Sequence, residues 1–299
     1  MKPPLIQPNS CQLWALLTLL GAASASAATV NWVGGSGEWN EPANWSTGSL
    51  PSPSDDVVID VPGNISVTHS TDDHTVRSIL CQEEFVLSGG TLTVLRTVQV
   101  NNELALSGGT LSKASILRAT TAQVVVANGG VLDGVTLRGE VTVPSGQSLI
   151  LTNGLTLLDG ARVTLKNTTA LYFSPGTQTL EGQGEIVMED TTPTNFLSSI
   201  LVYLGYGGES ALTIGPHLTV RGRGRIVQSS PSTLLNQGTI QAEVSGGELS
   251  IALSSVTNIG TLRALGGTLS VSRLAAGAMG GTFELIGSGS DLTLEGYDY

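Results

Sequence analysis

The feature that most constrains the fold is a short glycine-centred motif that recurs about every 20 residues. Leu-Ser-Gly-Gly-Thr-Leu occupies residues 87–92 and recurs unchanged at residues 106–111. Looser copies lie at residues 127–132, 244–249 and 264–269. Neighbouring Gly-Gly pairs are separated by 19, 21 and 20 positions. A fixed period of this length, built from short apolar runs and glycine turns, is typical of a solenoid.

Two further repeats agree with this period. Asn-Gln-Gly-Thr-Ile-Gln-Ala at residues 236–242 matches Asn-Ile-Gly-Thr-Leu-Arg-Ala at residues 258–264, 22 positions later. Residues 182–188 resemble residues 222–228, 40 positions later, which corresponds to two periods of 20. Between the turns the chain consists of short β-prone runs, and the segment Phe196 to Tyr203 is interpreted as strand as well. No capped helical period follows the N-terminal segment.

These repeats predict an all-β chain wound as a parallel β-helix, or β-solenoid, of about 20–22 residues per coil. A coil of that length provides three short strands and three turns, and stacked coils pair each strand in parallel about 4.8 Å from the next. Side chains then alternate between the interior and water. An up-and-down barrel or a sandwich is the alternative fold, but neither requires a single period of 20.

Residues 1–27 are interpreted as a secretory signal peptide. Lys2 supplies a positive charge, residues 13–21 an apolar run, and Ala25-Ser26-Ala27 a small-residue cleavage site. An N-terminal membrane anchor is the alternative, which the shortness of the apolar run disfavours. No later stretch is long and apolar enough to cross a bilayer, so we expect no transmembrane segment after cleavage and a secreted or surface-exposed protein.

The expected mature chain is acidic and has one cysteine. Removal of residues 1–27 leaves 12 basic and 24 acidic residues, a net charge of -12, with Cys81 as the remaining thiol. A lone cysteine forms no intrachain disulfide. The negative charge argues against nucleic acid and anionic membranes as partners.

Residues 28–62 form a distinct tryptophan-rich module ahead of the repeat domain, residues 63–299. Trp32, Trp39 and Trp45 lie in a stretch with many Gly, Pro and Asn residues, which predicts an irregular N-terminal cap. A solenoid needs its open end covered, and three indoles bury a large apolar area. The alternative is that exposed Trp39 and Trp45 form a stacking platform for sugar rings.

The sequence shows no catalytic constellation. Parallel β-helices also host polysaccharide lyases and hydrolases, but no close pair of acids suited to glycoside hydrolysis stands out in the middle coils. Asp72-Asp73 and Asp55-Asp56 are interpreted as solvated turns because Ca²⁺ needs six or more oxygen ligands. His69, His74 and His217 show no metal-ligand spacing. We therefore expect no enzyme activity, no metal and no cofactor.

One basic cluster is a candidate binding site. Arg221, Arg223 and Arg225 alternate with glycines, so in one extended strand all three point to the same face. Residues 181, 183 and 185 are their expected equivalents two coils earlier. A surface charge ladder is one interpretation, and a contact for an anionic saccharide is the other, because arginine binds carboxylate or sulfate in a bidentate manner.

The repeats resemble those of large bacterial surface proteins. Gly-Gly-Thr-Leu at 20-residue intervals, with Asn-x-Gly-Thr-Ile/Leu-x-Ala between, is similar to autotransporter passengers and filamentous adhesins. The segment from Trp39 to Ile59 is similar to the opening of G8-type domains. This resemblance implies a right-handed parallel β-helix and a surface location, although we expect no C-terminal barrel of the autotransporter kind within residues 1–299.

The expected function is structural or adhesive, without catalysis, with extracellular glycans or other surface proteins as partners. The alternatives are a polysaccharide-active enzyme and a non-catalytic glycan-binding module. An enzyme should show a groove lined by facing carboxylates and a basic residue, whereas a scaffold should show ladders of Ser, Thr and Asn. A glycan-binding module should expose Trp39 or Trp45.

Overall fold

The fold is described from a computed structural model that places residue 1 and residues 27–117, 124–189, 201–205, 207–275 and 280–296. The signal peptide expected at residues 1–27 lies almost wholly outside the described residues and stays a prediction. The same holds for residues 196–200 of the strand expected at 196–203, whereas Leu201–Leu204 forms a strand. Within the described part of the chain, no helix is long and apolar enough to span a bilayer.

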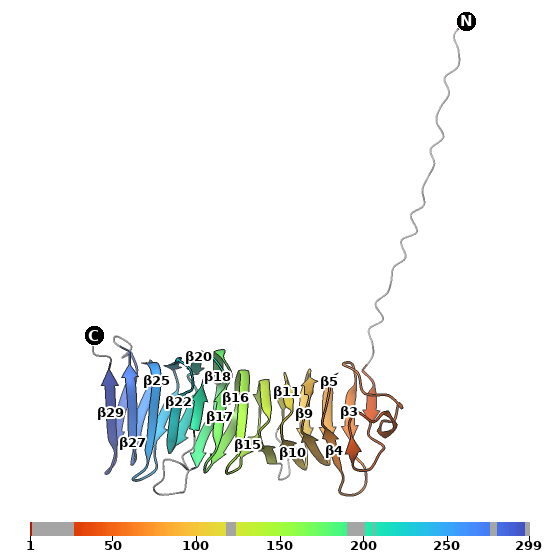
Figure 1. Cartoon of the computed structure of the whole chain (residues 1–299), viewed down its shortest axis with the longest axis horizontal. Helices are drawn as coiled ribbons and strands as arrows, with labels where there is room; N and C mark the ends of the chain where they lie inside the picture. Colours follow the sequence, from red (N-terminus) through yellow and green to blue (C-terminus); the bar gives the residue numbers. More distant parts are fainter. Residues whose placement is uncertain (2–26, 118–123, 190–200, 206, 276–279, 297–299) are drawn as a thin grey trace.

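The strands wind into a parallel β-solenoid of about 10 turns, which confirms the predicted fold class. Successive coils lie side by side along one axis, from the orange N-terminal coils to the blue C-terminal coils (Figure 1). The pairings arrange the strands in three faces, which we number in the order given below.

Face 1 is built from the strands β1 (Thr29–Asn31), β3 (Asp56–Ile59), β6 (Ser78–Cys81), β9 (Thr97–Val100), β12 (Ser115–Ile116), β20 (Ser210–Ile214) and β23 (Ser232–Asn236). Face 2 is built from β2 (Gly37–Glu38), β4 (Ser66–His69), β7 (Glu84–Leu87), β10 (Glu103–Leu106), β13 (Val124–Ala127), β15 (Glu140–Val143), β21 (Leu218–Gly222), β24 (Thr239–Ala242), β26 (Thr261–Leu265) and β28 (Thr282–Ile286).

Face 3 is built from β5 (Asp73–Val76), β8 (Thr91–Val94), β11 (Thr110–Ser112), β17 (Ala170–Phe173), β19 (Leu201–Leu204) and β22 (Gly224–Gln228). Longer strands bend around corners and contribute to two or three faces: β14 (Val131–Leu137), β16 (Ser148–Lys166), β18 (Gly176–Glu189), β25 (Glu248–Asn258), β27 (Thr268–Leu274) and β29 (Asp291–Gly296).

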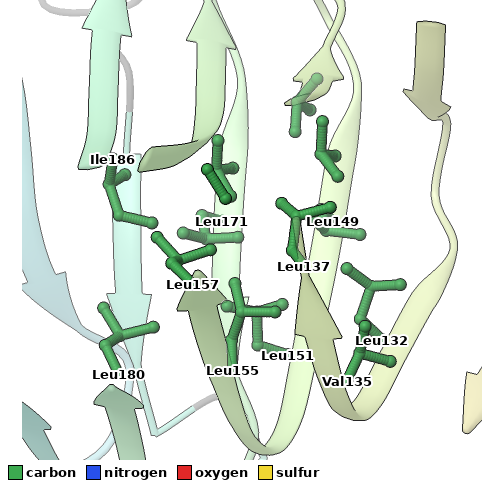
Figure 2. Packing of buried hydrophobic residues seen from close by; sticks show 14 of the residues in the cluster. Leu132, Val135, Leu137, Leu149, Leu151, Leu155, Leu157, Leu171, Leu180 and Ile186 are labelled. Carbon is green, nitrogen blue, oxygen red and sulfur yellow. The ribbon is translucent and has the colours of Figure 1, made fainter. Parts of the chain in front are cut away.

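The predicted repeats stack in register. Thr91 pairs with Thr110, which pairs with Val131, so the first three copies of the glycine motif lie one above another. The leucine that follows each of these residues points inward and is buried, as the alternation of side chains requires. In the middle coils such positions form continuous apolar ladders, and Figure 2 shows Leu132 and Leu151 as neighbours in one of them.

A polar ladder runs inside the later coils. Asn236 and Asn258 are register partners, both have no exposed surface, and Nδ2 of Asn236 donates to Oδ1 of Asn258 over 2.8 Å. This confirms that the 22-residue repeat marks equivalent positions. The expected equivalence of residues 182–188 with residues 222–228 is wrong, because Gly184 pairs with Leu218 and Met188 with Gly222. Unequal coil lengths put the two motifs at different corners.

The tryptophan-rich segment forms the first coil of the solenoid. Its strand β2 pairs with β4 and its strand β3 pairs with β6, so the hydrogen-bonded ladder is continuous from this segment into the repeat domain. Between β2 and β3 the chain makes a short 3₁₀ helix, Pro42–Asn44. The Glu41 side chain caps this helix by accepting a hydrogen bond from the Ala43 amide. At the opposite end, the last described coil exposes Leu285, Ile286 and Leu294.

Candidate functional site

The three indoles of the first coil are buried. Trp32 and Trp45 are 2% exposed and Trp39 is 0% exposed. Trp45 lies edge-on to both others, with ring centroids 4.9 Å from Trp32 and 4.7 Å from Trp39. The Trp45 indole donates to the carbonyl oxygen of Trp39 over 2.8 Å. The interpretation of Trp39 and Trp45 as an exposed sugar platform is therefore corrected: their faces are occupied by each other and by the core.

A histidine pair that the sequence interpretation missed lies beneath this cap. Nε2 of His69 is 3.0 Å from Nδ1 of His74, and Nδ1 of His69 is 3.0 Å from the Gly89 carbonyl oxygen. Because that carbonyl only accepts, Nδ1 of His69 is protonated, and its neutral ring accepts the proton of His74 at Nε2. Asp72, with φ of +62°, reverses the chain between the two histidines. The only indication of this contact in the sequence is that His69 and His74 are five positions apart across a turn.

Burial and the neighbouring ring disfavour a charge on His69. Desolvation is the main cause that lowers the pKa of His69, and the adjacent His74 lowers that pKa further. Trp39 packs against both rings, at centroid distances of 5.8 and 6.3 Å, and its own indole nitrogen is buried without a hydrogen-bond partner among the described residues. The pair is thus part of the cap packing and is not presented to solvent at His69.

Charged side chains on the outside of face 2 are joined into a row. Arg162 and Glu185 form an ion pair, and Nε of Arg221 donates to Oε2 of Glu185 over 2.6 Å. Arg221 also pairs with Glu243. Hydrogen bonding to Arg221 is the main cause that lowers the pKa of Glu185, and the same bond raises the pKa of Arg221.

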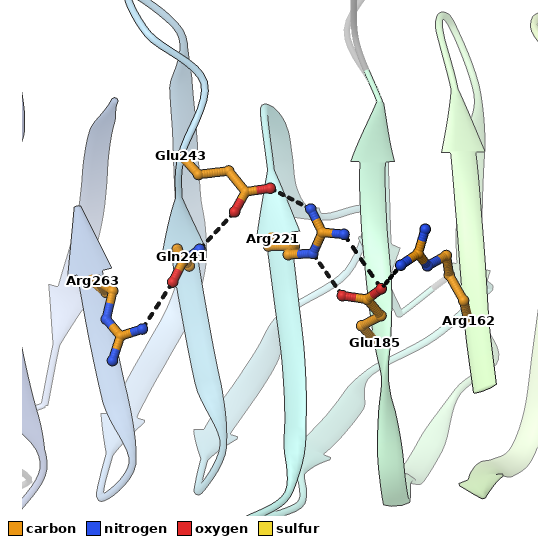
Figure 3. A network of polar contacts seen from close by, with 6 residues as sticks. All are labelled: Arg162, Glu185, Arg221, Gln241, Glu243 and Arg263. Atoms are coloured by element: carbon orange, nitrogen blue, oxygen red, sulfur yellow. Dashed lines mark hydrogen bonds and ion pairs between the residues drawn. The ribbon is translucent and has the colours of Figure 1, made fainter. Parts of the chain in front are cut away.

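The row continues toward the C-terminal coils. Gln241 donates to Glu243 over 2.6 Å and accepts from Arg263 over 3.0 Å, and Arg263 pairs with Glu284. Figure 3 shows the contacts from Arg162 to Arg263 crossing β16, β18, β21, β24 and β26. Each of these carboxylates faces at least one arginine, so the row holds neighbouring coils together.

The predicted arginine cluster does not exist as one face. Arg221 is on β21, Arg225 is on β22, and Arg223 lies at the bend between these strands. The flanking Gly222 and Gly224 have φ of +116° and +156°, which turns the backbone through a corner of the solenoid. The three side chains therefore do not share one face, and Arg221 is already bound to two carboxylates.

A groove of about 500 Å³ crosses the corner between faces 1 and 2 in the middle coils. Six positions separate Leu155 from Ala161 in β16, whereas four separate their register partners Leu180 and Gly184 in β18. The β16 corner therefore contains two additional residues, and Leu158 in that corner lines the groove. A long corner beside a shorter one leaves a hollow that a strictly regular solenoid lacks.

Glycine keeps the backbones of these corners close together. Gly182 has φ of +92°, and a Cβ atom there would lie 1.9 Å from the carbonyl oxygen of Leu157. A Cβ atom at Gly215, in the next corner, would lie 3.0 Å from the carbonyl oxygen of Leu180. Both glycines line the groove, so its base is backbone and its walls are the side chains on either side.

The groove gathers polar side chains that make no hydrogen bond or ion pair with the described residues. They are two threonines, two glutamines, one glutamate and one histidine: Thr179, Glu181, Gln183, Thr213, His217 and Gln237. Leu158 and Pro216 add apolar surface. The lining contains one carboxylate and no arginine or lysine, which differs from the facing acids and basic residue expected of a polysaccharide-cleaving groove.

Other chemistries find little support in the described part of the chain. No group of three or more His, Cys, Asp or Glu side chains there could hold a metal ion. Cys81 is free and buried, and burial raises the pKa of its thiol to about 12, so it is not a reactive nucleophile. The groove is therefore the candidate functional site.

Comparison of the chain with protein-family models, with curated proteins and with solved structures finds no match. The resemblance to autotransporter passengers and filamentous adhesins thus rests on the repeats alone, and the resemblance to G8 domains rests on the segment from Trp39 to Ile59 alone. The fold itself stands on the strand pairings of this chain.

Proposed function

We propose that this chain is an exported, cell-surface β-solenoid with a structural or adhesive role and no catalytic activity. The observation that supports the proposal most strongly is the use of polar side chains between coils. Asn236 bonds to Asn258 inside the solenoid, and the row from Arg162 to Glu284 bonds coil to coil outside it. These ladders hold a stack of coils together, which suits a scaffold that carries a surface away from its attachment point.

Export is the part of the proposal that the N-terminal segment motivates. Lys2, the apolar run and Ala25-Ser26-Ala27 have the order of a secretory signal. The test is expression of the full chain in a bacterial host, followed by cell fractionation and mass spectrometry of the N-terminus. We expect a product outside the cytoplasm that begins at Ala28. A full-length product confined to the cytoplasm would refute export.

Adhesion and catalysis are tested on cells and on the purified protein. Cells that display the chain should adhere to glycan-coated surfaces more than cells that display nothing, and protease treatment of intact cells should abolish the difference. Incubation of the purified chain with plant, algal and microbial polysaccharides should release no reducing ends. Release of oligosaccharides would instead favour a polysaccharide-active enzyme, and Glu181→Gln would then be the first variant to examine, since Glu181 is the carboxylate in the groove.

A further inference from the structure

We infer that the corner groove between faces 1 and 2 is a binding site for an uncharged saccharide. The inference rests on the proposed function for its biological setting, and it specifies the class of partner that the adhesive role would use. Two neighbouring surfaces differ in how their polar side chains are bonded. On face 2 the charged side chains are bonded to one another, whereas the polar side chains in the groove have no protein partner among the described residues.

The groove has the dimensions of a small-ligand site. Its volume of about 500 Å³ lies within the ordinary range for such sites, about 300–1,000 Å³. The hollow is part of the backbone design, because it follows from the longer β16 corner and from the close packing at Gly182 and Gly215. The backbone at Gly182 and Gly215 therefore forms the base of the hollow.

The lining offers the hydrogen-bonding groups that sugar hydroxyls need. Gln183 and Gln237 each provide an amide that donates and accepts, and the Glu181 carboxylate accepts. His217 provides a ring nitrogen of each kind when neutral. Pro216 and Leu158 provide apolar surface for the C–H face of a pyranose ring. A hydroxyl-rich ligand would satisfy all of these groups together.

The same lining disfavours the other ligand classes. Glu181 repels anions, and the groove has no arginine or lysine to hold sulfate, phosphate or a uronic acid. Arg162 and Arg221, on the adjoining face, are bonded to Glu185. One carboxylate is too few for a divalent cation, which prefers six or more oxygen ligands. The lining therefore favours an uncharged saccharide, whereas the arginine motif in the sequence suggested an anionic one.

The test is a glycan array carrying uncharged oligosaccharides beside sulfated and uronic-acid glycans, probed with the purified mature chain. The positive uncharged glycans are then titrated by calorimetry. We expect binding to uncharged members, and an affinity lower by roughly tenfold or more when Gln183→Ala is combined with Gln237→Ala, because two ligand hydrogen bonds are lost. Thr213→Trp, which fills the groove from the outer side of β20, should abolish binding.

Matched controls keep the result specific. Gln147→Ala removes a glutamine from the turn that begins at Pro144, outside the groove, and should leave the affinity unchanged. Circular dichroism and thermal melting should show that every variant stays folded. The inference is overturned if no uncharged glycan binds, if only anionic glycans bind, or if the groove variants bind as tightly as the parent chain.

The outcome is separable from that of the proposed function. Binding by the purified chain without export would support the groove and refute the surface role. Export without binding would support the surface role and refute the groove as a binding site. Mass spectrometry of the oligosaccharide after incubation distinguishes binding from turnover, and we expect the ligand to be recovered intact.

Discussion

At the scale of the residue, two buried polar pairs matter because a hydrogen bond joins each residue to its neighbour from another coil or turn. His69 and His74 bond to each other beneath the tryptophan cap, and Asn236 bonds to Asn258 in the core. A buried polar group without a partner costs free energy, so such pairs define which coil positions face each other. They also make the stability sensitive to small chemical changes.

The histidine pair predicts loss of stability in acid. The pKa of His69 in the folded chain is lower than its usual value of about 6.5, so the pair contributes its full stabilisation above that pH. As the pH falls below about 6.5 and through the lowered pKa, protonation of His69 places a hydrogen on its Nε2, which can then no longer accept the bond from His74.

The charges around the pair modulate this effect. The charge of Asp72 raises the pKa of His69, whereas His74 lowers that pKa. The other nearby carboxylates have partners of their own: Glu38 accepts from the Ser70 hydroxyl, and Asp73 accepts from the Thr91 amide. Urea unfolding measured from pH 7.5 to 5 should show a falling midpoint. His69→Gln should flatten that pH dependence, and His217→Gln, at an exposed histidine, should not. An equal slope in both variants would contradict the assignment.

The asparagine ladder predicts a cost for truncation. Asn258→Ala should lower the free energy of unfolding by roughly 1–3 kcal/mol, because the buried Asn236 amide loses the nearest of its three acceptors, at 2.8 Å compared with 3.2 Å for the carbonyl oxygens of Gly238 and Thr261. The adjacent Ile259 is 50% exposed, and Ile259→Ala should change stability by about 0.5 kcal/mol or less. Chemical denaturation of both variants checks the difference, and similar values for the two would rule out a special role for the ladder.

At the scale of the element, the corners of the solenoid decide where a ligand has room. Strands supply a uniform wall, since inward positions repeat along each face, whereas the corners differ in length between coils. The β18 corner approaches the β16 backbone most closely at Gly182, where a side chain would meet the Leu157 carbonyl. The shape of the groove therefore depends on Gly182, a residue that has no side chain with which to bind a ligand.

Substitution at two glycines separates conformational strain from close approach. Gly160 and Gly182 both have positive φ, but a Cβ atom at Gly160 has no neighbour within 4 Å. Gly160→Ala should therefore cost about 1–2 kcal/mol, the penalty of the left-handed conformation. Gly182→Ala should add about 1–3 kcal/mol for overpacking against Leu157. Thermal melting of both variants tests this ranking, and an equal loss of stability would mean that the corner relaxes.

At the scale of the whole molecule, the coils are held together by continuous ladders that run along the axis. The buried cap closes the first coil, apolar columns fill the interior, and the row of ion pairs on face 2 joins β16 to β28. Arg221 stands at the middle of this row with contacts to Glu185 and Glu243. Its removal would leave two carboxylates short of a partner.

The row predicts a salt-dependent contribution to stability. Arg221→Ala should lower the free energy of unfolding by about 1 kcal/mol at low ionic strength, since the pair is part of a network on a partly exposed surface. The difference should shrink in about 1 M salt as the charges are screened. Arg225 makes no ion pair with the described residues, so Arg225→Ala is the control. A loss that is independent of salt would point to lost packing instead.

The architecture could be predicted from the sequence because the same local pattern recurs from coil to coil. Glycine turns and alternating apolar residues fix the strand length, the inward positions and the parallel stacking, so the motifs at residues 87–92 and 106–111 were predicted to lie in register and do. The burial of the three tryptophans followed from the need to cover an open end.

Which side chains meet between coils could not be predicted from the repeats. Register is set by the summed lengths of all the intervening corners, and these lengths vary, so Gly184 pairs with Leu218 and not with the similar Gly224. For that reason the sequence placed the three arginines on one face, missed the His69–His74 contact and did not reveal the groove. A period describes the average coil, whereas a site arises where one coil departs from it.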